Sequence, residues 1–395
     1  MYERASGSPG SGGLLDTLSD VTRARWIAVA APVALASLAV VVVMAAALRP
    51  DHGSSSAAPG ARPSSTVSTS ATTVASTTTT APRGRRGSGR PVTIAFGGDV
   101  HFEGMLRARL DANPTTALAP IAPVLSSADL AMVNLETAVT ERGTPAPKEF
   151  TFRAPATAFT ALASGGVDVA TMANNHGLDF GPVGLADSLA ASAFTRFPVV
   201  GIGRDAREAY APYRATVHGQ RIAVVGATQV IDGALVASWT ATDSHAGLAS
   251  AKDVARLLDA VRAVRPTADT VIVFLHWGVE GHTCPSADQE ALARTLVGAG
   301  ADVVIGGHAH RLQGGGRLGP ALVDYGLGNF VFYTAGGPGT QSGVLLVTVT
   351  GRDVDGYRFV PATLHGGVAT PLTGAAAGAA VAQWNALRSC TNLTP

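Results

Sequence analysis

The chain has 395 residues and an almost balanced charge, with 29 Lys and Arg against 28 Asp and Glu and a net charge of +1. With this balance we expect no general electrostatic attraction to acidic lipid and no nucleic-acid partner. The two cysteines, Cys284 and Cys390, are too far apart for a CxxC metal or redox motif. In an exported domain they could form a disulfide between the C-terminal tail and the loop after His276, and two unrelated thiols are the alternative.

Residues 26–48 form an uncharged apolar run of 23 residues, flanked by Arg23 and Arg25 on one side and by Arg49 on the other. As a helix this run would span about 34 Å, which is enough to cross the core of a bilayer. A cleavable signal peptide is the alternative, but its apolar region is normally shorter, about 7–15 residues. We therefore predict a retained transmembrane helix that follows a cytoplasmic N-terminal tail, residues 1–25.

Residues 49–90 consist mainly of Ser, Thr, Pro, Ala and Gly and contain almost no large apolar side chain. A segment of this composition cannot bury a core, so we predict a disordered linker with an r.m.s. reach of roughly 35 Å. Such a tether suits a domain held outside the membrane. The sequence then predicts a single-pass protein of the cell membrane, with an extracytoplasmic globular domain over residues 91–370 and a C-terminal helix and tail over residues 371–395.

From Pro91 onward, short apolar runs alternate with helical stretches. The predicted strands are residues 92–96, 130–133, 167–172, 222–225, 271–275 and 303–305, and the predicted helices are residues 155–165, 182–194, 251–264 and 287–299. Continuous apolar runs of this length are typical of strands covered on both faces, and their alternation with helices predicts a layered α/β fold. Later runs at 320–332, 343–349 and 356–364 have short connections, which favours antiparallel pairs and two sheets packed together.

Polar side chains follow five of these strands at the point where each strand ends. In chain order they are Asp99 and His101 in GGDVH, Glu136 in VNLE, Asn175 and His176 in ANNH, His276 in LHWG, and His308 and His310 in GGHAH. Functional residues of α/β proteins lie beyond the carboxyl ends of the strands, so we expect these side chains to lie close together. Carboxylate, amide and imidazole groups in this number are a ligand set for two divalent metal ions such as Mn, Fe or Zn.

In this order the motifs resemble those of the calcineurin-like metallophosphoesterases. The surrounding sequence is closer still to the bacterial capsule-synthesis CapA (poly-γ-glutamate) family within that fold, in the segments GGDVHFEG, ADLAMVNLET, FRAP, ANNHGLDFG, HWGVE, GADVVIGGHAH and YGLGNFVF. The likeness covers roughly residues 92–335. It implies a layered α-β-β-α sandwich, two metal sites, and a role in making, exporting or attaching an anionic polymer.

The resemblance also implies a role for each member of the cluster. Asp99, His101 and His310 would hold one metal ion, Asn175, His276 and His308 would hold the other, and Glu136 would lie between the two ions. His176 would be the acid or charge stabiliser at a leaving oxygen, with Asp99 as the other catalytic residue. This chain and its capsule-type relatives depart from the phosphoesterase pattern at two positions. The phosphoesterases bridge with Asp where this chain has Glu136, and many capsule-type relatives lack a His at the position of His101.

Taken alone, each residue has a structural alternative: Asp99 could cap a helix, Asn175 could hold a turn, and His276 could be a core histidine. Four further residues are weaker candidates. Arg153 in FRAP could bind a carboxylate or phosphate of the substrate, or it could be structural. Glu280 in HWGVE could support the substrate site, or it could start a helix. Asp179 could orient the His176 loop, and Asn329 could line the floor of the pocket.

Three functional hypotheses follow from this site together with the resemblance, and the polymer in the first two is implied by the resemblance alone. The leading one is a metal-dependent hydrolase of envelope polymer production, which cleaves a phosphoester or an amide of an anionic polymer and works with membrane polymer-synthase subunits. The second is a non-catalytic partner of a membrane polymerase, whose polar pocket holds polymer carboxylates. The third is a metal-free acid–base enzyme, for instance an epimerase, with His176 and a carboxylate as the two bases.

Overall fold

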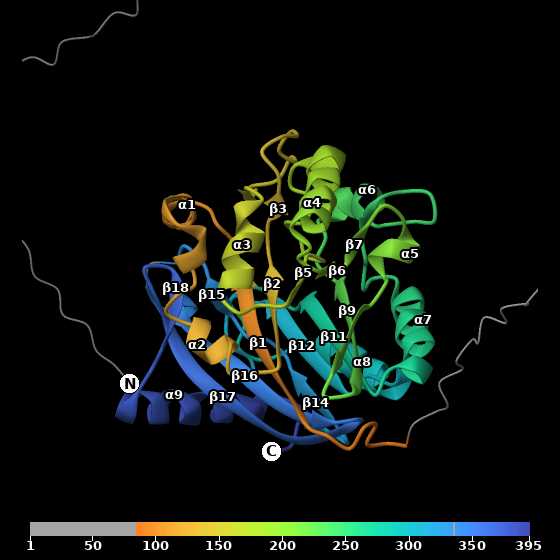
Figure 1. Ribbon diagram of the computed structural model, residues 1–395, viewed down its shortest axis with the longest axis vertical. Coiled ribbons are helices and arrows are strands. Elements are labelled where there is room, and N and C mark those ends of the chain that lie inside the picture. The colour runs from red at the N-terminus through yellow and green to blue at the C-terminus, as the bar shows by residue number, and fades with distance from the viewer. Residues whose placement is uncertain (1–83, 335) are drawn as a thin grey trace, which may run out of the picture. The chain divides into compact units, whose positions relative to one another are not determined.

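The computed structural model describes residues 84–334 and 336–395 (Figure 1). The predicted N-terminal tail, the predicted transmembrane helix and all of the predicted linker before residue 84 lie outside the described residues. Among the helices of the described ranges, none is both long and apolar enough to cross a membrane.

Residues 84–90, which composition places in the linker, form turns that bind to the globular domain. The guanidinium groups of Arg85 and Arg86 form ion pairs with Asp353, and the side-chain amide of Gln220 donates to the carbonyl of Arg86 at 3.1 Å. The domain therefore includes these residues and does not begin at residue 91. Composition could not show this, because the contacts join segments more than a hundred residues apart.

The larger of the two main sheets has eight strands in the order β15-β18-β17-β16-β1-β2-β5-β6. These are β1 (Val92–Val100), β2 (Leu130–Leu135), β5 (Val169–Thr171), β6 (Val199–Val200), β15 (Asn329–Val331), β16 (Gln341–Thr350), β17 (Asp353–His365) and β18 (Val368–Pro371). The antiparallel pairing predicted for the late strands holds for β16 with β17. β15 pairs antiparallel with β18 and also lies parallel to β1, because the chain enters β15 from the other sheet and not through a hairpin.

The smaller main sheet has six strands in the order β13-β14-β12-β11-β9-β8. These are β8 (Tyr213–Val217), β9 (Gln220–Thr228), β11 (Thr270–Trp277), β12 (Val303–His308), β13 (Gly315–Leu318) and β14 (Ala321–Asp324). The central strands β9, β11, β12 and β14 are parallel. Two further sheets have two strands each, and they pair β3 (Ala138–Val139) with β4 (Arg153–Ala154), and β7 (Ile202–Gly203) with β10 (Gly247–Leu248).

Helices cover the outer faces of both sheets. The α-helices of the described residues are α1 (Met105–Ala112), α2 (Ala122–Leu125), α3 (Thr157–Ser164), α4 (Gly181–Thr195), α5 (Ala206–Ala209), α6 (Val236–Trp239), α7 (Val254–Val264), α8 (Ala287–Ala299) and α9 (Gly374–Ala386). Short 3₁₀ turns occur at η1 (Pro114–Thr116), η2 (Gly233–Leu235), η3 (Arg265–Thr267), η4 (Pro338–Thr340) and η5 (Leu387–Cys390).

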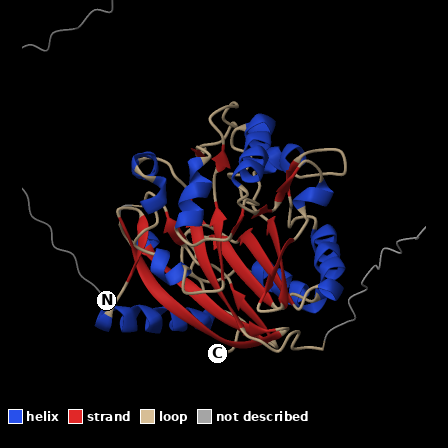
Figure 2. Ribbon diagram, in the orientation of Figure 1, coloured by secondary structure: helices blue, strands red, loops and turns tan. Residues whose placement is uncertain are grey.

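Three hydrophobic clusters show that the layers run helix, sheet, sheet, helix. The first packs the outer face of the eight-stranded sheet against helices α1 to α4, and Phe159 of α3 is among its members. The second packs the six-stranded sheet against α7 and α8, with Leu257 and Leu296. The third lies between the sheets and includes Phe96 of β1 and Phe274 of β11. The two sheets lie side by side with helices outside them (Figure 2), so the prediction of two packed sheets is confirmed.

The C-terminal segment is tied to the domain by a disulfide between Cys284 and Cys390. Cys284 lies in the loop between β11 and α8, and Cys390 ends the 3₁₀ turn that follows α9. Of the two alternatives left open by the sequence, the structure has the disulfide.

Candidate metal centre

The polar strand ends converge where the carboxyl ends of the two sheets meet. Asp99 lies in the last two residues of β1, His308 ends β12, and Glu136 directly follows β2. A carboxylate oxygen of Asp99 lies 3.3 Å from Nδ1 of His310, and Oε1 of Glu136 lies 3.5 Å from Nε2 of His276. Side chains that are up to about two hundred residues apart in the sequence therefore form one cluster.

The glycine before His308 allows β12 to approach β1. A Cβ on Gly307 would lie 2.4 Å from Oδ1 of Asp99, which is too close for any other residue type. The backbone N–H of His308 donates to Oδ2 of Asp99 at 3.0 Å. His308 and His310 have φ angles of 90° and 53°, a region that costs a residue other than glycine about 1–3 kcal/mol. Strain of this kind is concentrated at functional sites, and here it directs two imidazoles into the cluster.

Glu136 lies at the centre of the cluster. Its Oε1 is 3.5 Å from Nε2 of His276 and 3.9 Å from Nε2 of both His176 and His310. The side chain is fully buried, and neither carboxylate oxygen has a hydrogen-bond partner among the described residues. Burial, reinforced by the nearby charge of Asp99, raises the pKa of Glu136 well above its ordinary value. A buried carboxylate without donors is unfavourable, and a bound cation would relieve this cost.

Two groups of ligand atoms share Glu136, and in each group all atoms lie within 4.8 Å of one another. One group is Asp99, Glu136 and His276, and the other is Glu136, His308 and His310. Nδ1 of His308 is buried and has no hydrogen-bond partner in the described part of the chain. Carboxylates and imidazoles of this kind fit two divalent transition ions with Glu136 between them. In the first group Asp99 lies with His276, and the expected pairing of Asp99 with His310 is also present, at 3.3 Å.

The histidines of the cluster differ in protonation. Burial opposes the charged form of His310, but the carboxylates of Glu136 and Asp99 outweigh it and raise the pKa of His310 to about 9. Burial and the neighbouring imidazoles of His308 and His310 lower the pKa of His276 well below its ordinary value. Burial likewise lowers the pKa of His308 to about 3. Of these three histidines, His310 is therefore the one that carries a positive charge in the metal-free protein.

Two buried asparagines hold the ligands in place, and neither was singled out from the sequence. The side-chain amide of Asn134 in β2 donates to Oδ1 of Asp99 at 2.8 Å and lies 3.0 Å from Nδ1 of His276. Asn174 donates to Oδ1 of Asn134 at 3.0 Å and accepts from the backbone N–H of His176. Because each asparagine contacts two elements, they fix the relative positions of β1, β2, β11 and the His176 loop.

His176 is oriented by a carboxylate and a buried amine. Its Nδ1 lies 2.5 Å from Oδ2 of Asp179, and Nζ of Lys148 lies 2.9 Å from the other oxygen of Asp179. Burial lowers the pKa of His176, and the hydrogen bond that His176 donates to the carboxylate of Asp179 opposes this shift. The ring of Phe152 stacks on His176 with a centroid distance of 4.0 Å. Lys148 was not a candidate from the sequence, although it is one of only two lysines in the chain.

His101 and Asn175, the two remaining expected ligands, each have contacts of their own. The His101 ring stacks on Phe152, and both of its nitrogens face backbone N–H groups, Nδ1 that of Glu103 at 3.0 Å and Nε2 that of Tyr333 at 3.3 Å. Burial lowers the pKa of His101 to about 3. Oδ1 of Asn175 lies 2.7 Å from Nε2 of His276, so this amide oxygen already faces an expected ligand of the same ion.

Three weaker candidates lie around the rim. Asn329 places its Oδ1 2.9 Å from Nδ1 of His310, so it positions a ligand as well as lining the pocket. The guanidinium group of Arg153 lies over the ring of Phe180 at 4.4 Å and has no ion pair within the described ranges. Glu280 is exposed, and its charge contributes to the raised pKa values of Glu136 and His310.

The fold and the cluster together define a layered α/β protein with a candidate dinuclear metal centre. Residues 93–334, more than half of the chain, match the family described as bacterial capsule synthesis protein PGA_cap, and the chain belongs to this family. The family resemblance read from the sequence motifs is therefore confirmed.

Two curated relatives carry related names. The chain is 36% identical over 175 residues to the capsule biosynthesis protein CapA of Bacillus anthracis, which covers 44% of this chain and 42% of that protein. It is 30% identical over 225 residues to the PGA biosynthesis protein CapA of Bacillus subtilis, which covers 54% of this chain and 55% of that protein. The chain thus spans about half the length of the curated relatives it matches.

Solved structures with a similar arrangement are more distant in sequence. A phosphatase from Mycoplasma pneumoniae aligns with 69% of this chain and 94% of its own, at 16% identity and a TM-score of 0.43. A protein from Staphylococcus aureus that is described as a 5'-nucleotidase aligns with 74% of this chain and with 58% of its own chain, at 16% identity and a TM-score of 0.40.

Proposed function

We propose that this protein is a metal-dependent hydrolase that acts on an anionic polymer of the cell envelope, of poly-γ-glutamate type. The observation that carries the hydrolase assignment is Glu136, a fully buried carboxylate with three imidazoles around it and no hydrogen-bond donor among the described residues. Membership of the capsule synthesis family and the names of the curated relatives support the polymer as the substrate.

The residues that would hold two ions of Mn, Fe or Zn are Asp99, Glu136, Asn175, His276, His308 and His310, with His101 as a further ligand of the Asp99 side. Bound there, the ions would polarise a phosphoester or amide and lower the pKa of a water molecule. The protein would supply the proton. Nδ1 of His176 donates to Asp179, so His176 exchanges a proton at Nε2, the atom that faces Glu136. We assign His176 as the acid at the leaving group and Asp99 as the second catalytic residue.

Two residues at the rim would contact the polymer. The guanidinium of Arg153 has no ion pair among the described residues and lies over the ring of Phe180 at 4.4 Å, so it is free to bind a polymer carboxylate through two hydrogen bonds. Glu280 is exposed beside the cluster and would accept hydrogen bonds from polymer amide N–H groups. If these roles hold, Arg153→Gln raises KM for a polyanionic substrate more than it lowers kcat.

The decisive experiment is the metal content of the full-length protein by elemental analysis. We expect about two transition ions per chain, loss of at least one ion in His308→Ala, and no loss in His365→Ala, which removes an exposed imidazole outside the cluster. No bound metal after reconstitution would overturn the hydrolase and favour a polymer-binding subunit or metal-free acid–base chemistry. With metal present, phosphodiesters and γ-glutamyl polymers should be screened, and activity of His276→Ala equal to wild type would contradict the mechanism.

The proposal includes a place in the cell. Residues 26–48 would be a retained single-pass anchor, with the domain outside the membrane and membrane polymer-synthase subunits as partners. Protease added to cells without a wall should then degrade the domain and leave a fragment of the N-terminal tail and anchor. A domain that stays intact until the membrane is opened would contradict this orientation, and a crosslinked pull-down without membrane subunits would contradict the partner.

A further inference from the structure

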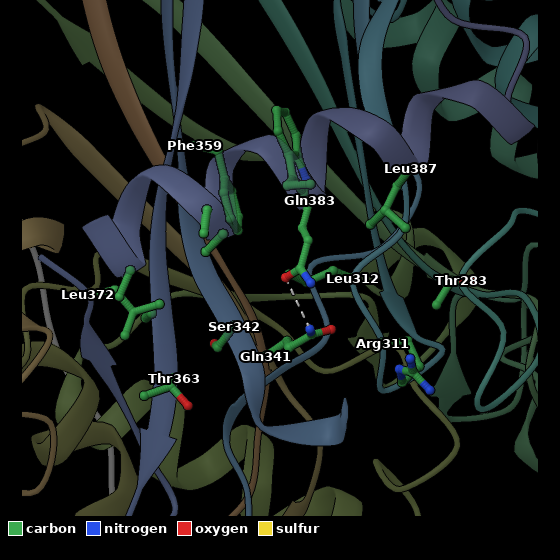
Figure 3. Close-up of a pocket in the computed structure, with 15 residues that line it drawn as sticks. Thr283, Arg311, Leu312, Gln341, Ser342, Phe359, Thr363, Leu372, Gln383 and Leu387 are labelled. Carbon is green, nitrogen blue, oxygen red and sulfur yellow. Dashed lines mark hydrogen bonds between the residues drawn. The ribbon is translucent and has the colours of Figure 1, made fainter. Parts of the chain in front are cut away.

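A separate cavity lies beside the C-terminal helix. Helix α9 covers the part of β16 and β17 that faces inward, and Trp384 of α9 stacks on Phe359 of β17 with a centroid distance of 4.8 Å. Between the helix and these strands is a cavity of about 550 Å³ (Figure 3). None of the candidate metal ligands lines it.

The walls of the cavity are mostly apolar because α9 turns short side chains toward the sheet. Ala376, Ala379 and Ala380 line the helix side, and Phe359 and Leu372 lie across from them. Among the residues of α9, Trp384 alone is buried, so the strands do not enclose the other side chains of the helix. A cavity of this volume and lining falls in the range that small apolar ligands occupy.

One end of the cavity carries a single unpaired cation. Arg311 is the only charged residue among those that line it. Within the described ranges its guanidinium has no ion pair, and its Nε is buried without a hydrogen-bond partner. Thr283 and Leu387 lie at the same end (Figure 3), next to the disulfide that joins the loop after β11 to the helix segment. A buried guanidinium N–H needs an acceptor, and a carboxylate provides two in the matching geometry.

We propose that this cavity binds a single-chain amphiphile with one carboxylate, such as a long-chain fatty acid. The apolar chain lies against the alanines of α9, and the carboxylate pairs with Arg311. The lining offers one positive charge and no second cation, which matches a monoanion better than a phosphate dianion. The side-chain amide of Gln341 in β16 donates to Oε1 of Gln383 in α9 at 3.5 Å, so the two walls of the cavity are joined by this hydrogen bond (Figure 3).

Photo-crosslinking tests this proposal on the full-length protein in membranes. The probe is a twelve-carbon fatty acid that carries a diazirine, and the labelled peptides are mapped by mass spectrometry. We expect saturable labelling of residues 372–387, competed by dodecanoate and not by dodecanol. Arg311→Gln and Ala379→Leu should each reduce it at least tenfold, the first by removing the charge and the second by filling the cavity. Ala382→Leu, at an exposed position of the same helix outside the lining, should label like wild type.

Each other outcome overturns the proposal in a distinct way. Labelling confined to residues 26–48 would place the fatty acid in the apolar N-terminal segment and not in the cavity. Equal competition by dodecanol would remove the role of Arg311, and competition by monododecyl phosphate alone would replace the carboxylate with a phosphate. Labelling that survives Ala379→Leu would move the ligand to another surface. Because metal content is not a readout here, failure of this proposal leaves the hydrolase proposal standing.

Discussion

Replacement of Glu136 by Gln should make the metal-free protein more stable and prevent it from binding metal. Gln has nearly the same shape and cannot ionise. The wild-type carboxyl has a raised pKa because it is buried, so folding must either confine its charge in apolar surroundings or protonate it. An unsatisfied buried group of this kind costs about 1–3 kcal/mol. For a domain of about three hundred residues, this corresponds to a rise in Tm of roughly 2–6 °C.

The gain in stability should increase with pH. The folded-state pKa of Glu136 is raised above the ordinary value of 4.5, so the folded wild type holds a proton that the unfolded chain releases. Wild-type stability therefore falls as pH rises through this interval, whereas a glutamine side chain does not titrate. The difference in unfolding free energy between the Glu136→Gln variant and wild type should then be small near pH 4.5 and larger at pH 8.

Thermal unfolding followed by circular dichroism tests both parts, with a chelator and with Mn²⁺ added. Metal at a hundred times its Kd should stabilise the wild type by about 2.7 kcal/mol, and Glu136→Gln should lose this shift. Glu141→Gln, a change at an exposed carboxylate paired with Arg107, is the matched control and should behave like wild type. A variant that unfolds below wild type in chelator, or that keeps the full metal shift, would refute the reasoning.

Three further changes give separate tests. Gly307→Ala places a Cβ 2.4 Å from a carboxylate oxygen of Asp99, so it should lower the unfolding free energy by about 1–3 kcal/mol and lower the metal content. Gly298→Ala in α8, where a Cβ would have no atom within 4 Å, is the control and should raise the unfolding free energy by about 0.5–1 kcal/mol. Equal denaturant midpoints for the two variants would contradict this. Cys390→Ser opens the disulfide and should lower the unfolding free energy by about 2–4 kcal/mol without reductant, and an unchanged midpoint would speak against it. Burial raises the pKa of Asp324 to about 7, so this group should make the wild type less stable as the pH rises from 4 to 7. Asp324→Asn should not show this loss, and unfolding free energies in urea that change with pH in parallel for the two proteins would count against the prediction.

The elements that the sequence predicts best are those whose pattern is local. Helix α8 has the predicted bounds, residues 287–299, because Ser286 and Gln289 form a capping box at its start and Gly300 ends it. The strand that leads to His276 is a continuous apolar run, and such a run is buried wherever it lies. The parallel pairing of β15 with β1 has no local signal, since it depends on which sheet the chain enters after residue 324.

The residues of the candidate site also differ in whether a local pattern of the sequence predicts them. Residues at strand ends could be found because the ends of parallel strands share one edge of a sheet. The supporting residues Asn134, Asn174 and Lys148 could not be assigned, because their roles depend on contacts across elements. Asn134 did carry a signal, as a carboxamide within an otherwise apolar strand must have buried partners. The expected grouping of Asp99 with His101 came from the resemblance to the family. The sequence itself could not provide it, because the direction of each side chain determines which ligand atoms lie together.

The disulfide makes the loop after β11 depend on a segment that follows it by about a hundred residues. The loop after β11 carries Glu280 and Cys284, and apart from the disulfide it is tied by hydrogen bonds from Gln313 to the carbonyls of His282 and Cys284. Cys284 precedes Cys390 by 106 residues, so during synthesis it stays a free thiol until residue 390 has been added. The covalent tie of this loop therefore forms after most of the domain has been synthesised, and it persists only under oxidising conditions.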